Sequence, residues 1–172
     1  MKKVAILGRA SGWNDAPFSD PSWEIWSLNY IYKIIRKLPN GRWDRWFDIH
    51  EKTRKDQQHR QELAKMNCPV YVTQQWDIPN AVLYPMEEIK REFFANVNRE
   101  QFFTSSIPYM IALALYEGFD EISLYGINQA AKTEYEKHIQ CTAFWLGIAL
   151  GRGVKVEVQK HSRLLNPETL YR

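Results

Sequence analysis

The stretch "TSSIPYMIALALYEGFDEISLYGIN", residues 104–128, decides the fold. From Ile107 onward its apolar residues recur at i, i+3, i+4, i+7 and i+8, which places them on one face of a helix. Gly118 stands where a glycine commonly ends a helix by adopting the left-handed conformation. The run "EISLYG" (121–126) then predicts a strand. A helix that leads directly into an apolar strand is typical of a βαβ unit, whose strands are parallel.

Short apolar runs elsewhere in the chain predict further strands. The first, "KVAILG" (3–8), is continuously apolar, so we expect it to be buried on both faces of a sheet. The other predicted strands are 23–29, 44–50, 68–73 and 154–158, and the helical patterns are 53–67, 84–94, 105–119 and 132–150. This alternation predicts a single domain, 1–172, with the fold of a doubly wound, mostly parallel, Rossmann-like three-layer α/β sandwich.

The composition is that of an ordinary globular protein, with 45% hydrophobic and 25% charged residues. The net charge of +3 suits an anionic small molecule but falls short of the strongly basic face that nucleic-acid binding requires. We therefore do not expect nucleic acid as a partner. Cys68 and Cys141 follow no metal or redox spacing and fit a reducing compartment, so we expect neither a metal nor a cofactor.

The N-terminal segment "MKKVAILG" has an apolar run that is too short for a secretory signal. No run in the sequence approaches the length of a transmembrane helix. We therefore expect a cytoplasmic protein with no membrane partner. Whether it forms a homo-oligomer stays open.

Polar residues gather where the predicted strands end and where the best predicted helix begins. In open parallel sheets, ligands bind beyond the carboxyl ends of the strands, so these residues are expected to converge. The candidate ligand-binding residues are Gly8, Arg9, Ser11, Gly12, Asn29, Thr104, Ser105, Ser106, Gly126 and Asn128.

Two of these segments each have two interpretations. The loop "GRASG" (8–12) lacks both the GxGxxG fingerprint and a Walker lysine. Its glycines would let backbone N–H groups approach an anion, and Arg9 would add charge, but a tight polar turn explains the same residues. The hydroxyls of "TSS" (104–106) suit an anion site at a helix N-terminus, or an ordinary N-cap that needs only one of them.

His138 is the candidate catalytic residue, acting as a general base or acid, because imidazole titrates near neutrality. It shares a predicted helix face with Glu134 and Cys141, a set that lacks the partner motif of a zinc site. His50, in "DIHE" (48–51), would line the same rim or lie in a solvated loop.

The segment "GRWDRW" (41–46) alternates arginine with tryptophan. A cation beside a stacking ring is typical of platforms that bind single-stranded nucleic acid. The segment is short and contains an aspartate, so scaffold is the alternative interpretation.

The stretch 104–128 and the later "EYEKHIQCTAFWLGIALGRGVKVEVQKHSRLL" (134–165) together resemble a pattern found in small phage-encoded and bacterial proteins. The pattern is similar to those of the bacterial sialyltransferase family and the 6-hydroxymethylpterin diphosphokinase-like family. The resemblance implies a nucleotide-side loop at Gly8, Ser11 and Gly12, and helix-start contacts from Ser105 and Ser106. It also implies a catalytic base near His138 and a closing motif that begins at Ser162. Asn128 stands where these families usually have an aspartate.

The resemblance implies a small phage-type protein that binds a nucleotide or nucleotide sugar and acts as a glycosyl- or diphosphotransferase. Asn128 cannot ionise, the first loop lacks a second close glycine, and the chain is short for a sialyltransferase. These departures leave a second hypothesis, a non-catalytic protein that sequesters a nucleotide metabolite. A third hypothesis is a single-stranded nucleic-acid binder that uses Arg42, Trp43, Arg45 and Trp46.

Overall fold

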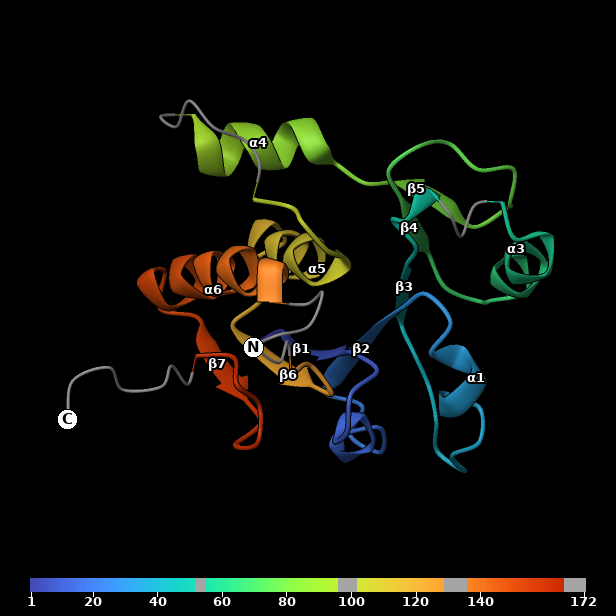
Figure 1. The fold of residues 1–172 in the computed structure, drawn as a ribbon, viewed down its shortest axis with the longest axis horizontal. Coiled ribbons are helices and arrows are strands. Elements are labelled where there is room, and N and C mark those ends of the chain that lie inside the picture. The colour runs from blue at the N-terminus through green and yellow to red at the C-terminus, as the bar shows by residue number, and fades with distance from the viewer. Residues whose placement is uncertain (52–54, 96–101, 129–135, 166–172) are drawn as a thin grey trace.

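Seven strands form one sheet in the order β5-β4-β3-β2-β1-β6-β7, and every neighbouring pair is parallel (Figure 1). The structure, a computed structural model, describes residues 1–51, 55–95, 102–128 and 136–165. The strands are β1 (Lys3–Leu7), β2 (Trp23–Leu28), β3 (Arg45–Phe47), β4 (Val70–Val72), β5 (Ala81–Leu83), β6 (Glu121–Tyr125) and β7 (Lys155–Val158). The predicted α/β fold is confirmed, and the sheet is fully parallel.

Helices cover both faces of this sheet, which gives the predicted three layers (Figure 1). On one face lie α4 (Met86–Phe94), α5 (Ser106–Tyr116) and α6 (Glu136–Gly151). On the other lie the short α1 (Tyr32–Ile35), α3 (Gln57–Ala64) and the 3-10 turn η1 (Trp13–Asp15). In the part of the chain that the structure describes, no helix combines the length and apolarity needed to cross a membrane.

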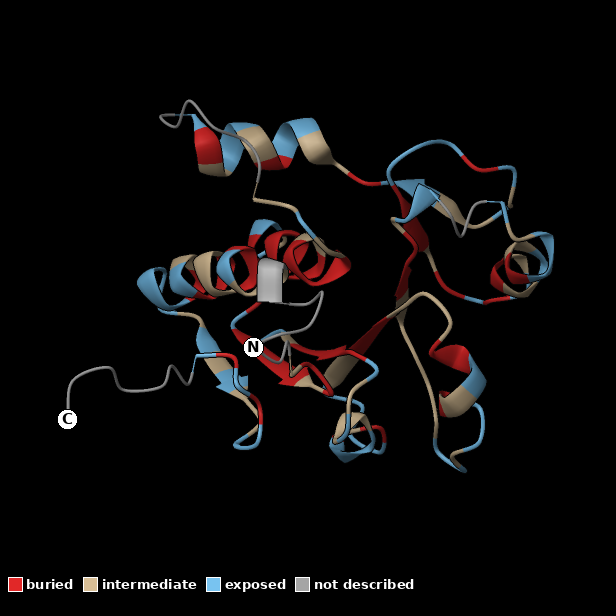
Figure 2. Cartoon of the chain, in the orientation of Figure 1, coloured by how far each residue is buried: buried red, intermediate tan, exposed pale blue. Residues whose placement is uncertain are grey.

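The strands at the centre of the sheet divide their side chains between two apolar clusters. Val4 and Ile6 pack with α5 and α6 on one face, whereas Ala5 and Leu7 pack with α1 on the other. Successive side chains of a strand point to opposite faces, so a strand buried on both sides must be continuously apolar. Buried residues accordingly run through the whole middle of the sheet in Figure 2, which confirms the prediction for β1.

The decisive helix ends as its sequence predicts. Gly118 has a φ of 73°, and the amides of Gly118 and Phe119 donate to the carbonyls of Leu115 and Ala114 at 3.2 and 3.0 Å. This is the Schellman arrangement, which satisfies carbonyls that have no partner within the helix. The helix therefore ends in a tight turn that leads directly into β6.

The elements that were not predicted include a short strand and a short helix. The strand β5 has three residues, and two of them, Val82 and Leu83, are exposed at the edge of the sheet. The helix α1 has four residues, fewer than a periodic pattern needs to be recognised. Both elements owe their conformation to packing and pairing with neighbours that are distant in sequence.

The strand order reverses at β1. From β1 the chain builds β2 to β5 on one side, and it then returns through α4 and α5 to place β6 and β7 on the other side. In doubly wound sheets this reversal opens a crevice at the carboxyl ends of the two central strands, where ligands bind. The fold thus directs attention to the ends of β1 and β6.

Candidate functional site

The carboxyl edge of the sheet brings together several of the predicted ligand-binding residues. The strands β2, β1 and β6 lie side by side and are followed by Asn29, Gly8 and Gly126, respectively. Neighbouring strands are about 4.8 Å apart, so these three residues form one short row. The loop after β3, which carries His50, leaves the sheet at the same edge.

Gly8 allows the first loop to close against the end of β6. Its amide donates to the carbonyl of Tyr125 at 2.7 Å, and the amide of Ala10 donates to the carbonyl of Gly126 at 2.8 Å. A Cβ atom at Gly8 would lie 2.4 Å from the carbonyl oxygen of Gly126. This glycine is therefore explained by close backbone packing within the chain.

Gln159, a residue that the sequence did not single out, completes this closure. Its Nε2 donates to the carbonyl of Gly12 at 2.8 Å, and its Oε1 accepts from the amide of Gly126 at 2.9 Å. The only sequence signal was its place directly after the last strand. Arg9 and Ser11, in the same loop, are exposed.

Ser105 and Ser106 open α5 without the hydrogen bond of an ordinary N-cap. Ser105 is the N-cap residue, yet its side chain makes no capping bond. Its Oγ is buried without a hydrogen-bond partner among the described residues. Ser106 is 4% exposed, and its Oγ lies 3.5 Å from Nε2 of His50. Thr104, just before them, is exposed.

Asn29 is held in an unusual conformation at the end of β2. Its φ is 48°, in the left-handed region that few residues other than glycine and asparagine adopt. Its amide donates to the carbonyl of Phe47 at 3.1 Å, and its carbonyl accepts from Nε1 of Trp46 at 3.2 Å. With its backbone fixed in this way, its side-chain Oδ1 is buried and lacks a partner in the described part of the chain.

Asn128 and Ser162 connect the end of β6 to the C-terminal segment. Oδ1 of Asn128 accepts from the amide of Arg163 at 3.0 Å, and Oγ of Ser162 donates to the carbonyl of Ile127 at 2.6 Å. Both side chains therefore make contacts within the chain. An amide oxygen at position 128 serves this purpose without ionising.

His138 lies in the first described turn of α6 and is partly buried. Helices α5 and α6 pack against each other, and both begin on the side of the sheet where the strands end. Glu134, which shares its predicted helix face, lies outside the described residues. Among the residues that the structure does describe, no group of three or more His, Cys, Asp or Glu is arranged to hold a metal ion.

His50 joins the candidate site, whereas Asp48 turns away from it. His50 is exposed and reaches Ser106. The carboxylate of Asp48 is fully buried and faces Nε2 of His59 on α3 instead. Of these two side chains, only that of His50 lies on the side of the candidate site.

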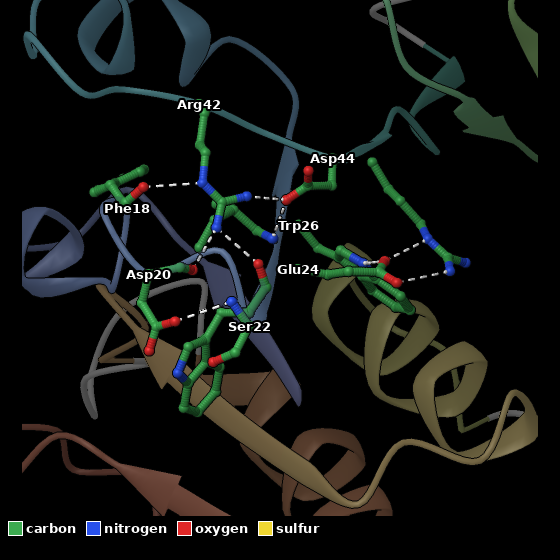
Figure 3. A network of polar contacts seen from close by, with 10 residues as sticks. Phe18, Asp20, Ser22, Glu24, Trp26, Arg42 and Asp44 are labelled. Atoms are coloured by element: carbon green, nitrogen blue, oxygen red, sulfur yellow. Dashed lines mark hydrogen bonds and ion pairs between the residues drawn. The ribbon is translucent and has the colours of Figure 1, made fainter. Parts of the chain in front are cut away.

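The arginine- and tryptophan-rich segment is part of the scaffold. Trp46 is fully buried, and Nε of Arg45 pairs with Glu24 at 2.9 Å while its Nη1 pairs with Glu117 at 2.7 Å. The guanidinium of Arg42 donates to the carbonyls of Phe18, Asp20 and Trp23 and pairs with Asp44, as Figure 3 shows. The structure therefore offers no support for a nucleic-acid platform in this segment.

A pocket of about 480 Å³ lies beside the Arg42 network. It is lined by residues at the amino ends of β1 and β2, including Lys3, Trp23 and Glu24, so it opens on the edge of the sheet opposite the candidate site. Glu24 pairs with Arg45, and Lys3 lies 5.4 Å from the centre of the Trp23 ring. Since these two charged groups already have partners within the chain, we place the candidate site at the carboxyl edge.

No protein-family model matches this chain, and no curated protein does. Solved structures match over almost the whole chain. The monofunctional α-2,3-sialyltransferase Cst-I of Campylobacter jejuni is 15% identical, with a TM-score of 0.66 over 96% of this chain and 78% of that protein. The sialyltransferase CstII of Campylobacter jejuni, in complex with the substrate analogue CMP-3FNeuAc, is 16% identical, with a TM-score of 0.62 over 92% of this chain and 80% of that one. These matches confirm the resemblance to the bacterial sialyltransferases at the level of the fold: the chain has their Rossmann-like fold.

Proposed function

We propose that this protein binds a cytidine nucleotide sugar at the carboxyl edge of its sheet and transfers the glycosyl group to an acceptor. The proposal rests on the chemistry of that edge and on the bacterial enzymes that share the fold. One of these was solved with the substrate analogue CMP-3FNeuAc, and another structure of CstII holds cytidine-5'-monophosphate.

Two buried oxygen atoms carry the proposal. Oγ of Ser105 and Oδ1 of Asn29 are both buried, and neither has a hydrogen-bond partner in the described part of the chain. A buried polar group without a partner costs about 1–3 kcal/mol. Both atoms lie at the edge where sheets of this kind bind ligands. A ligand with hydrogen-bond donors, such as a nucleotide with its sugar hydroxyls, would satisfy them.

The start of α5 supports an anionic ligand. The helix has 11 residues, and its first amides have no partner within the helix. Those amides and the helix dipole favour negative charge, so a phosphate fits this position. The hydroxyl of Ser106 adds a further donor beside them.

Transfer from such a donor requires a base. The acceptor hydroxyl gives its proton to an imidazole as its oxygen bonds to the glycosyl carbon. The bond from that carbon to the phosphate oxygen breaks, and cytidine monophosphate leaves with the electron pair. We assign the base to His138 and the orientation of the phosphate to Ser106 with His50. A positioned general base contributes roughly 10²- to 10⁴-fold to the rate.

The test combines binding and turnover. Calorimetry with cytidine monophosphate should show binding to the wild type, and Ser106→Ala should weaken it about tenfold or more, because a hydrogen bond to a charged group is worth about 1.5–3 kcal/mol. The matched control is Ser123→Ala, which removes a hydroxyl that is equally buried but lies in the middle of β6. Equal affinity in the wild type and Ser106→Ala would place the ligand elsewhere.

Turnover is measured as cytidine monophosphate released from a CMP-linked sugar in the presence of candidate acceptors. Release by the wild type supports a transferase. Tight binding without release from any donor would instead support a protein that sequesters the nucleotide.

A further inference from the structure

Asp48 and His59 form a fully buried pair beside the candidate site. Asp48 follows β3, His59 lies on α3, and both side chains have an exposed fraction of 0%. Oδ2 of Asp48 faces Nε2 of His59, which donates to it in the tautomer that carries its hydrogen on Nε2. The other ring nitrogen, Nδ1, lies 3.1 Å from the hydroxyl of Tyr32. In the neutral imidazole this nitrogen accepts the hydroxyl hydrogen.

The same imidazole is fixed by the loop that carries Asn29. Tyr30, the next residue, lies with its ring centre 4.1 Å from that of His59. Its hydroxyl donates to Asp56 at 2.9 Å, and Asp56 in turn accepts from the amide of His59 at 3.0 Å. The hydroxyl and ring contacts together tie the segment that follows β2 to the first turn of α3. Burial, and then the bond to Asp56, raise the pKa of Tyr30 to about 12, so this hydroxyl stays protonated and remains a donor at neutral pH.

The carboxylate anchors the loop that carries His50. The amide of Asp48 donates to the carbonyl of Tyr71 on β4 at 2.9 Å, so its backbone is fixed as well as its side chain. His50 is only two residues further along the chain. Each of the two loops therefore has a residue that contacts His59. Tyr30, next to Asn29, packs on its ring, and Asp48, two residues before His50, contacts its Nε2.

We propose that Asp48 and His59 are positioning residues of the candidate site, which hold the loop after β2 and the loop after β3 at a fixed separation. Apolar side chains of similar size would often stabilise α3 equally well, because burying charged groups is expensive. Directional hydrogen bonds add a defined distance between the two loops, which a binding site needs. The effect on ligand binding rests on the proposed function, whereas the effect on the loops does not.

The experiment compares variants of the pair with a control at the other end of α3. Asp48→Ala removes the acceptor, and Asp48→Asn retains an oxygen that accepts from Nε2 of His59. The control is Asn80→Ala, because Nδ2 of Asn80 donates to the carbonyl of Leu63 in the last turn of that helix and to those of Met66 and Cys68 just past it. Each variant is assayed for cytidine monophosphate affinity, for hydrogen exchange of the Asn29 amide and for the ring-proton NMR shift of His50.

We expect Asp48→Ala to weaken the affinity by about 3- to 30-fold, the size of coupling that hydrogen-bond networks carry between positions. It should also speed exchange at Asn29 and move the His50 signal, and Asp48→Asn should restore most of each effect. Asn80→Ala should lower stability while leaving all three readouts close to wild type. If Asp48→Ala does not fold, Tyr32→Phe is the decisive variant. It deletes only the hydroxyl that lies 3.1 Å from Nδ1 of His59, and it should speed exchange at Asn29.

Several results would overturn the proposal. In the first, the folded variants of the pair keep the wild-type exchange rate of the Asn29 amide and the wild-type NMR shift of the His50 ring protons. Another is equal effects of Asn80→Ala and Asp48→Ala at equal loss of stability, which would mean that the pair only stabilises α3. If the wild type binds no cytidine monophosphate, the proposed function fails, and the exchange and NMR readouts still decide the role of the pair.

Discussion

Replacing Gly8 with alanine should destabilise the protein although it adds a single methyl group. The new Cβ would lie 2.4 Å from the carbonyl oxygen of Gly126 and 2.7 Å from Cγ1 of Ile127. Ordinary contacts between such atoms are about 3.5 Å or longer, so the loop or the end of β6 must move by about 1 Å. Such a shift would lengthen the 2.7 Å bond from the Gly8 amide to Tyr125. Overpacking of this kind costs about 1–3 kcal/mol, and a lost hydrogen bond adds about 1 kcal/mol.

The assay is urea unfolding followed by tryptophan fluorescence, with Gly147→Ala as the matched control. Gly147 lies on the exposed face of α6, and a Cβ there would meet nothing within 4 Å. Because alanine is the better helix former, the same substitution should stabilise the protein by about 0.5–1 kcal/mol. The two variants should therefore shift the midpoint in opposite directions. A Gly8→Ala protein as stable as wild type would refute the conclusion that the first loop closes tightly against β6.

Three further outcomes follow from the structure. Arg42→Lys should cost about 1–3 kcal/mol in chemical denaturation, because one ammonium cannot replace a planar guanidinium that binds three carbonyls and Asp44; an unchanged midpoint would argue against the network in Figure 3. Hydrogen bonding to Arg36 lowers the pKa of Glu62 to about 2, so the stabilising effect of this carboxylate is present above its ordinary value of 4.5 and is lost as the pH falls toward 2. The Glu62→Gln variant should therefore lose less free energy of unfolding than the wild type between pH 6 and pH 3. The difference between the two losses should be below about 1 kcal/mol, because the pair lies at the surface. Equal losses would contradict this. His138→Ala should abolish release of cytidine monophosphate from a CMP-linked sugar while leaving nucleotide affinity nearly intact, and a variant that still turns over would place the base elsewhere.

Much of the fold could be predicted from the sequence because its signals are local. The continuous apolar run of β1 and the periodicity of α5 each report a burial pattern that the backbone geometry dictates. Gly118 marks the end of α5, since the left-handed turn there favours glycine. The convergence of the ends of β1, β2 and β6 could also be predicted, because parallel topology alone brings them together at one edge of the sheet.

The use of each polar residue was decided by the tertiary structure. In the sequence, Gly8 and Gly12 fit a phosphate-binding loop and a tight turn equally well. The contacts with Gln159 and with the end of β6 show that the loop closes within the chain. Arg45 and Trp46 have the composition of a stacking platform, but pairing of β3 with β2 and β4 buries the ring and gives the cation acidic partners. Hydrogen bonds and ion pairs join residues that are distant along the chain, so a sequence names the donors and acceptors, and only the fold determines which of them meet.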